Sequence, residues 1–323
     1  MMKILEKPVL KTGTLENLAE YGMSLATETP LEDLLESATK IREKHFGRKI
    51  EFCMISNAKC GLCRNDCHFC SQSAHYATEI SSYPLHSAEQ LSQEASSAAE
   101  CGAFHFGIVT SGATLTRFEV EQIAESVREM TESGKIKMCA SLGKLERSAL
   151  ETLKEAGLVR YHHNLETSEA FYPEICTTQQ WRDRYNMVRL ARESGMEVCS
   201  GTLFGMGETW QDRIDLALTL RELEVTCVPM NFLHAHPGTP LAEEPPLSAD
   251  EALRIIAVYR HLLPETSLRI CGGRPKILAE KQSMMFAAGA DAVMTGNYLT
   301  TSGITPETDA RMVEQLGLSL LKL

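Results

Sequence analysis

From about residue 50 onward, short apolar runs alternate with amphipathic segments, and this alternation restricts the fold more than any other feature of the chain. Several of the amphipathic segments end at a glycine, as at Gly102, Gly157 and Gly195, and glycine is a common helix stop. Strand–helix units repeated in this way predict an α/β fold, a (βα)8 TIM-type barrel with an N-terminal helical extension. An open doubly wound sheet is the alternative, which periodicity does not separate from a barrel. The candidate strands are 51–56, 103–110, 136–140, 159–164, 197–203, 227–232, 268–271 and 292–295, and the helices between them include 88–101, 119–133, 147–156, 180–194, 210–222 and 250–262.

The first part of the chain has a different pattern. Thr29-Pro30 is a typical helix start, with threonine as the cap and proline at the first helical position. Leu31, Leu34, Leu35 and Ala38 then recur at helical spacing. We therefore expect residues 1–48 to form a helical segment that packs on the barrel, and residues 49–323 to form the barrel itself.

Charge and hydropathy exclude several classes of function. The formal net charge is −11 and no run of Lys and Arg is present, which argues against binding to nucleic acid or to an anionic membrane. No stretch approaches the roughly 18 apolar residues of a membrane span, and residues 1–10 do not resemble a secretory signal. We therefore expect a cytoplasmic protein. In that compartment the 11 cysteines are better explained by metal binding or catalysis than by disulfides.

Four cysteines gather in one loop, Cys60-Gly-Leu-Cys63-Arg-Asn-Asp-Cys67-His-Phe-Cys70, directly after the first candidate strand. Zinc ribbons place two Cys-x-x-Cys pairs much farther apart, so a structural zinc site fits this spacing poorly. The thiols could also be inert. The third reading takes Cys63, Cys67 and Cys70 as three ligands of a four-iron cluster, which leaves one iron open, as catalytic metal sites do.

This Cys-x3-Cys-x2-Cys spacing, with the aromatic Phe69 before the last cysteine, resembles the signature of the radical S-adenosylmethionine (SAM) superfamily. The resemblance implies a 4Fe-4S cluster on Cys63, Cys67 and Cys70 whose open iron binds the amino and carboxylate groups of SAM. One electron then cleaves SAM to methionine and a 5′-deoxyadenosyl radical. Cys60 lies outside the motif and is expected to be a spare thiol or to have a redox role.

Within that superfamily, several short blocks between residues 50 and 302 resemble the biotin synthase family in their order and spacing. They are Cys70-Ser-Gln-Ser73, Tyr161-His-His-Asn-Leu-Glu-Thr-Ser168, Val198-Cys-Ser-Gly201, Gly205-Met-Gly-Glu208, Pro229-Met-Asn231, Pro237-Gly-Thr-Pro240 and Leu299-Thr-Thr301.

The resemblance implies a SAM site with two parts. Asn164 and Glu166 alternate with Leu165, so both point to the same side of a strand, and they match residues that hold SAM. Arg184 matches a position near the methionyl carboxylate. The remaining residues expected at SAM are Phe69, Gly205, Gly207 and Glu208.

The same resemblance implies a dethiobiotin site. Asn231 matches the contact to the ureido ring, and an amide offers both a donor and an acceptor for it. Thr300 and Thr301 match the contact to the carboxylate tail. His162 stands where the family more usually has a second asparagine, and Asn164 lies between SAM and substrate.

The family also holds an auxiliary two-iron cluster that donates sulfur, on three cysteines and one arginine. Cys139, Cys199 and Arg269 match three of those ligands, whereas His105 stands at the place of the fourth. Cys271 shares a strand face with Arg269, so we hypothesise that Cys139, Cys199 and Cys271 hold a rebuilt cluster. With His105 as a ligand it would be a mixed His/Cys two-iron site; without it, a four-iron cluster whose open iron carries an extra sulfide fits better. We favour the four-iron form, with Arg269 as a charge partner. The other cysteines are expected to be core or surface thiols, namely Cys53, Cys101, Cys176 and Cys227.

The implied activity is conversion of dethiobiotin to biotin by a radical SAM sulfurtransferase. It would need a low-potential electron donor such as flavodoxin or ferredoxin, and the family implies a homodimer. The alternatives are a related radical enzyme, such as a hydrogenase maturase, and an iron–sulfur or sulfur carrier protein without radical turnover.

Overall fold

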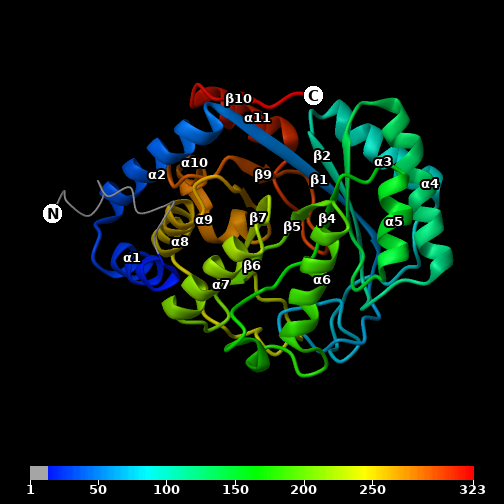
Figure 1. Cartoon of the computed structure of the whole chain (residues 1–323), viewed down its shortest axis with the longest axis horizontal. Coiled ribbons are helices and arrows are strands. Elements are labelled where there is room, and N and C mark those ends of the chain that lie inside the picture. The colour runs from blue at the N-terminus through cyan, green and yellow to red at the C-terminus, as the bar shows by residue number, and fades with distance from the viewer. Residues whose placement is uncertain (1–13) are drawn as a thin grey trace.

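The structure is a computed structural model that describes residues 14–323. Its centre is a barrel of parallel strands (Figure 1) in the order β1-β2-β3-β4-β5-β7-β8-β9, and β9 pairs back onto β1. This closure confirms the predicted barrel and excludes the open sheet. β5 and β6 both pair with β7, so together they occupy the place of one barrel strand that is interrupted between them. The bounds are β1 Lys49–Lys59, β2 His105–Thr110, β3 Lys137–Ser141, β4 Arg160–His162, β5 Glu197–Cys199, β6 Thr202–Phe204, β7 Cys227–Phe232, β8 Ser267–Ile270 and β9 Ala292–Met294.

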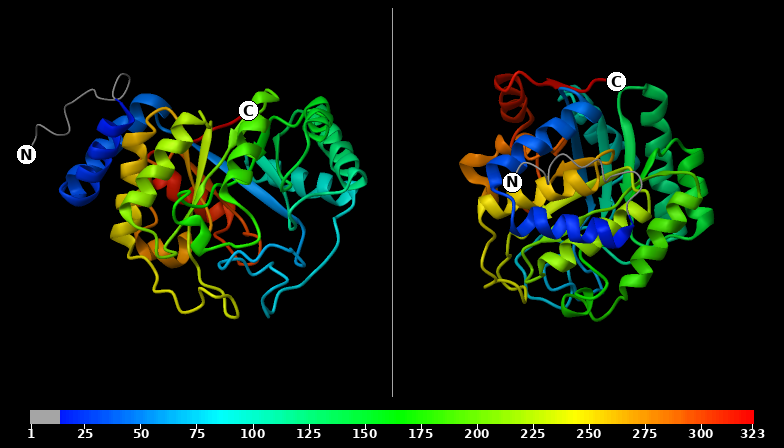
Figure 2. Two further views of the ribbon diagram at one scale, coloured as in Figure 1. Left: turned by 60° about the horizontal axis from the view of Figure 1, so that its bottom comes forward. Right: turned by 60° about the vertical axis from the view of Figure 1, so that its left-hand side comes forward.

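The amphipathic segments form an outer ring of helices, which surrounds the strands in both views of Figure 2. Local signals set their ends: α4 begins with a capping box between Thr116 and Glu119 and ends at Gly134, whose φ is +64°. The bounds are α3 Ala88–Glu100, α4 Arg117–Ser133, α5 Arg147–Glu155, α6 Trp181–Glu193, α7 Trp210–Glu222, α8 Ala249–Leu262, α9 Arg274–Leu278, α10 Met284–Ala287 and α11 Pro306–Gln315, with short 3-10 helices at Tyr172–Glu174 and Ala279–Lys281.

Two further helices, α1 (Leu15–Thr27) and α2 (Leu31–Phe46), pack outside α7 and α8. His261 at the end of α8 connects them, since its ring nitrogens lie 2.8 Å from the Tyr21 hydroxyl and 2.8 Å from Ser37 Oγ. Residues 1–13 of the expected 1–48 segment lie outside the described residues, as do residues 1–10 discussed above. Within residues 14–323, no helix is long and apolar enough to span a membrane.

The long connections lie at the carboxyl ends of the strands. The light-blue loop that follows β1 and the yellow loop that follows β7 extend from the same end of the barrel in the left view of Figure 2. The opposite end is covered near the start of β1 by β10 (Ser319–Leu320), which pairs with Lys49 and Ile50. Side chains at the loop end therefore meet over the barrel mouth, as expected for this fold.

Candidate functional site

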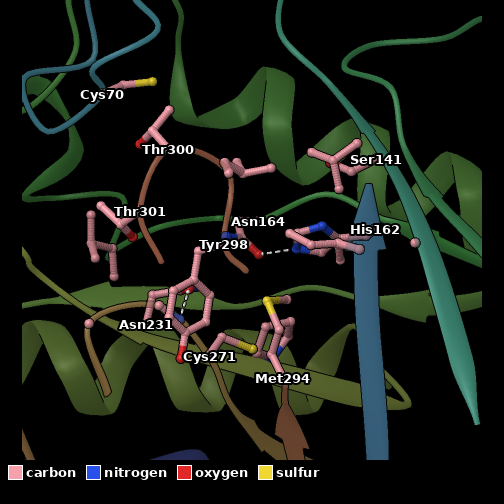
Figure 3. A pocket seen from close by; sticks show the side chains of 18 of the residues that line it. Cys70, Ser141, His162, Asn164, Asn231, Cys271, Met294, Tyr298, Thr300 and Thr301 are labelled. Carbon is pink, nitrogen blue, oxygen red and sulfur yellow. Dashed lines mark hydrogen bonds between the residues drawn. The ribbon is translucent and has the colours of Figure 1, made fainter. Parts of the chain in front are cut away.

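A cavity of about 300 Å³ runs into the barrel from the carboxyl ends of the strands. Cys70 lies at its mouth, and Cys271 and Met294 lie deep inside, with Asn164, Asn231 and His162 between them (Figure 3). Nearly all strands of the barrel contribute residues to its wall. A single internal space therefore joins the cysteine loop to the cysteines on the strands.

The cysteine loop folds back on itself through its backbone. Cys63 donates its N–H to the Gln72 carbonyl at 3.0 Å, and the Cys63 carbonyl accepts from Ala74 at 2.7 Å. A further turn brings the Cys70 N–H to the Cys67 carbonyl at 2.9 Å. Of the three motif cysteines only Cys70 lines the cavity, next to Phe69, while Cys67 is buried and Cys63 half-buried.

These residues fit a cluster better than a single metal ion. Within residues 14–323, no group of three His, Cys, Asp or Glu side chains could hold one ion. An iron–sulfur cluster does not require such convergence, because each thiolate binds a different iron. Three thiols on one loop with one at a cavity mouth are the donor set that a four-iron cluster with an open iron needs.

The structure adds a cysteine that the sequence pattern does not connect with the motif. Cys176 Sγ lies 3.7 Å from Cys67 Sγ. Asp66 holds the two segments together, since its carboxylate accepts hydrogen bonds from the backbone and hydroxyls of Thr177 and Thr178. More than 100 residues separate the two thiols in sequence, and no local spacing could have predicted the contact. Cys60 is also buried, and its backbone forms an isolated antiparallel β-bridge with Tyr83.

Three of the expected SAM residues, Asn164, Glu166 and Arg184, form one hydrogen-bonded network with His162. Asn164 Oδ1 lies 2.6 Å from His162 Nε2 and accepts from the Gly201 N–H at 3.0 Å, while Asn164 Nδ2 donates to Glu166 at 3.2 Å. Arg184 reaches the same place from α6: Nη1 donates to the Asn164 carbonyl at 3.0 Å and lies 3.5 Å from Glu166 Oε1. Glu166 has a φ of +70°, a conformation that is uncommon for non-glycine residues and that occurs at functional sites among other places.

Burial sets the protonation of this network. It lowers the pKa of His162 to about 4, so the ring is neutral near neutral pH. The neutral ring donates from Nε2 to Asn164, which leaves Nδ1 as an acceptor. Burial raises the pKa of Glu166, and Arg184 opposes that rise. The network thus presents an acceptor on His162 and the Glu166 carboxylate beside one cation, Arg184.

The glycine loop lies behind this network and outside the cavity wall. Gly205 and Gly207 have φ values of +91° and +100°, which glycine adopts without strain. The buried Glu208 carboxylate accepts from the N–H groups of Gly205 and Met206 and from Arg213. Glu208 therefore shapes the loop rather than facing the cavity.

The other expected substrate residues, Asn231, Thr300 and Thr301, lie across the cavity from His162 (Figure 3). Asn231 is fixed by its own amide, since Nδ2 donates to the Thr202 carbonyl at 3.0 Å and Oδ1 accepts from the Gly272 N–H at 3.0 Å. Thr300 Oγ1 lies 3.2 Å from Ser71 Oγ in the cysteine loop. Thr301 also lines the cavity. One amide hydrogen of Asn231 stays free for a ligand.

Three of the expected auxiliary ligands and Arg269 line the same cavity. Cys139 on β3, Cys199 on β5 and Cys271 after β8 all line it, although they lie far apart in sequence. Arg269 Nη1 is 3.7 Å from Cys199 Sγ. Burial raises the pKa of Cys139 and of Cys271, with Arg160 and Arg269, respectively, opposing the rise.

His105 does not line the cavity. It is fully buried, and its Nδ1 lies 2.8 Å from Glu51 Oε1. The residue of β2 that lines the cavity beside Cys139 is Gly107, two positions further along the strand. Cys53 on β1 lines the same space. Cys227 is buried against Cys199 but does not line the cavity, and Cys101 is half-buried on the helix side.

Unpartnered polar atoms surround this thiol group. Arg160 Nη1, Arg269 Nε and His105 Nε2 are buried and have no hydrogen-bond partner. Buried N–H groups are rarely left unpaired, so guanidinium N–H groups beside thiols indicate a missing anionic acceptor. A sulfide-containing cluster, which accepts hydrogen bonds at its sulfurs, fits this donor set.

Comparison with known proteins gives the family. Residues 59–220 match the radical SAM superfamily, and residues 229–319 match the Biotin and Thiamin Synthesis associated domain. The chain is 46% identical over 315 residues to biotin synthase of Trichlorobacter lovleyi, covering 97% of this chain and 95% of that protein. It is 48% identical over 291 residues to biotin synthase of Desulfovibrio desulfuricans, covering 90% and 92%.

Solved structures support the fold alone. Methylornithine synthase superposes with a TM-score of 0.83 at 20% identity, covering 99% of this chain and 97% of that one. The FeFe-hydrogenase maturase from Carboxydothermus hydrogenoformans gives 0.82 at 18% identity, covering 99% and 78%.

Proposed function

The chain belongs to the biotin synthase family of radical SAM sulfurtransferases, and from this membership we propose that it converts dethiobiotin into biotin. The observation that carries the proposal is the single cavity, whose wall includes Cys70 at one end and Cys139, Cys199 and Cys271 at the other. A substrate between them would lie within reach of both the radical source and the sulfur source.

Cys63, Cys67 and Cys70 would hold the SAM-cleaving 4Fe-4S cluster, which supplies the electron for cleavage when bound. Arg184 and Asn164 would bind the methionyl end of SAM, and Glu166 would accept hydrogen bonds from its ribose hydroxyls. Phe69 would pack against the ligand at the mouth. Gly205, Gly207 and Glu208 would shape the loop behind the adenine.

Dethiobiotin would lie between the two cluster sites. The free amide hydrogen of Asn231 and the acceptor Nδ1 of His162 suit the carbonyl and N–H groups of a cyclic urea. Thr300 and Thr301 would donate to its carboxylate near the mouth. The part of the cavity lined by the buried residues Cys139, Cys199 and Cys271 would exclude water from a carbon radical.

The sulfur source would be an auxiliary cluster on Cys139, Cys199 and Cys271. We favour a four-iron core with an extra sulfide, with Arg269 donating a hydrogen bond near Cys199 rather than acting as a ligand. The two-iron alternative would recruit His105. A flavodoxin or ferredoxin would supply electrons, and the protein would act as a homodimer.

The test is an anaerobic assay of the reconstituted protein with SAM, a low-potential reductant and dethiobiotin, following biotin and 5′-deoxyadenosine. Biotin, together with deoxyadenosine that depends on dethiobiotin, would establish the reaction. Deoxyadenosine without biotin would refute the substrate, and Cys70→Ala should abolish both products.

A further inference from the structure

β2, the strand on which His105 was expected at the place of the fourth auxiliary ligand, has a glycine beside Cys139 in the cavity wall. Gly107 on β2 lies beside Cys139 in the register of β2 and β3 and lines the cavity. His105, two residues earlier, is outside the cavity wall and is engaged by Glu51. β2 therefore contributes no thiol to the deep cavity.

The neighbouring strand contributes one instead. Cys53 on β1 is 3% exposed and lines the cavity together with Cys139, Cys199 and Cys271. In the register it lies beside His105 on one side and Met294 of β9 on the other. Its strand is thus adjacent to the one that lacks the thiol.

The strand register places Cys53 near one of the assigned thiols. Cys53 pairs with Met294 of β9, and the preceding residue Val293 pairs with Ile270, which directly precedes Cys271. Four thiols from β1, β3, β5 and the end of β8 therefore surround one space, next to the unpartnered N–H groups of Arg160 and Arg269.

We infer that Cys53 is a fourth cysteine ligand of the auxiliary cluster, at the iron that Cys139, Cys199 and Cys271 leave free. This inference rests on the proposed function. It gives a four-iron core one thiolate for each iron without recruiting His105.

Cys53 would then be the ligand that an extra sulfide replaces. In that exchange the iron–sulfur bond to Cys53 would break as a bond to hydrogen sulfide forms, and the departing thiolate would take up a proton of hydrogen sulfide, with no electron transferred.

The experiment compares Cys53→Ala with Cys227→Ala, which removes a thiol buried in the same barrel outside the cavity wall. Each protein is reconstituted with ⁵⁷Fe and an equal amount of sulfide, so that no sulfide beyond the two cores is supplied. Iron counting and Mössbauer spectra are the readouts. We expect about eight irons per chain in the wild type and in Cys227→Ala, and a loss of about one iron per chain in Cys53→Ala, because three thiolates remain to hold the rest of the auxiliary core.

A conservative variant separates ligation from packing. Cys53→Ser offers an oxygen at the same place, so it should keep more iron than Cys53→Ala and change the Mössbauer parameters of one site. Circular dichroism and the SAM-dependent signal of the first cluster show whether each variant is folded.

The inference is overturned if Cys53→Ala matches Cys227→Ala in iron, sulfide and spectra, or if His105→Ala rather than Cys53→Ala loses iron from the auxiliary cluster. A failure of the proposed function looks different. In that case the wild type itself holds only about four irons per chain and forms no biotin.

Discussion

His261 connects α1 and α2 to the barrel, and its titration should make that connection sensitive to acid. The ring is 2% exposed and contacts Tyr21 and Ser37 through its two nitrogens. Burial lowers its pKa from 6.5 to about 4, with Arg260 adding to the effect. Between these two pKa values the imidazole is protonated in the unfolded chain and neutral in the folded one. The contribution of His261 to stability is therefore complete at a pH above 6.5, the value in the unfolded chain, and is lost as the pH falls below it.

The magnitude follows from those two pKa values. Between about pH 7.5 and about pH 5.5, His261 alone should remove about 1.3 kcal/mol from the free energy of unfolding. In His261→Gln, the amide can still donate and accept, but it does not titrate. The difference between the free energies of unfolding at the two pH values should therefore shrink by about 1.3 kcal/mol in that variant.

Urea unfolding of the cluster-free protein, followed by circular dichroism, measures this difference. Tyr21→Phe is the matched control, because it removes one hydrogen bond and leaves the imidazole in place, so it should lower stability equally at both pH values. An unchanged pH difference in His261→Gln would refute the reasoning.

Three other substitutions test the site. Arg184→Lys cannot span the Asn164 carbonyl and Glu166 together, so the Kd for SAM should rise roughly ten-fold, as one lost charge-assisted hydrogen bond implies; an unchanged Kd in equilibrium dialysis would contradict this role. Gly201→Ala would place a Cβ 2.0 Å from a backbone oxygen of β7, and it should cost about 3 kcal/mol in urea unfolding; a loss below about 1 kcal/mol would mean that the strand shifts freely. Thr301→Val should raise the KM for dethiobiotin roughly ten-fold while leaving deoxyadenosine formation without substrate unchanged, and equal effects on both would argue against a substrate contact.

The fold was largely predictable from the sequence because its signals are local. The range 227–232 matches β7, and glycine stops and capping residues place most helix ends within one or two residues. The expected strand at 159–164 is shorter, since β4 ends at His162, and Asn164 and Glu166 lie beyond it rather than alternating along a strand. The expected strand at 197–203 also differs, since it is divided into β5 and β6. Its two halves meet at Ser200-Gly201, where a side chain on Gly201 would collide with β7. That constraint comes from a neighbouring strand, so the local pattern does not contain it.

The lining of the cavity was less predictable. Strands of a parallel barrel are buried on both faces, so alternation does not tell which face points inward. Phe52, Cys53 and Met54 all look like core in sequence, and only the closed barrel shows that Cys53 faces the cavity. His105 and Gly107 share one face of β2, but only Gly107 lines the cavity wall, because alternation does not tell at which depth along the barrel axis a residue lies.

Charged side chains at the bottom of the barrel explain how an anionic group could be accommodated deep in an apolar core. Arg160 and Arg269 both approach the Glu51 carboxylate, at 3.8 and 2.5 Å, and His105 uses the same oxygen. Burial opposes the charge on Glu51, but these partners hold its pKa well below the usual range. Arg160 is also bound by Glu197, at the edge of the barrel.

One buried carboxylate cannot satisfy two guanidiniums, and the donors it leaves over are Arg160 Nη1 and Arg269 Nε, which have no hydrogen-bond partner. A buried cation without enough acceptors is costly. An anionic cluster on the neighbouring thiols would supply the missing acceptors. The arginines would in turn compensate the charge of the cluster. Without the arginines, the thiols would hold a cluster whose negative charge is not compensated. Without the cluster, the guanidinium groups lack hydrogen-bond acceptors.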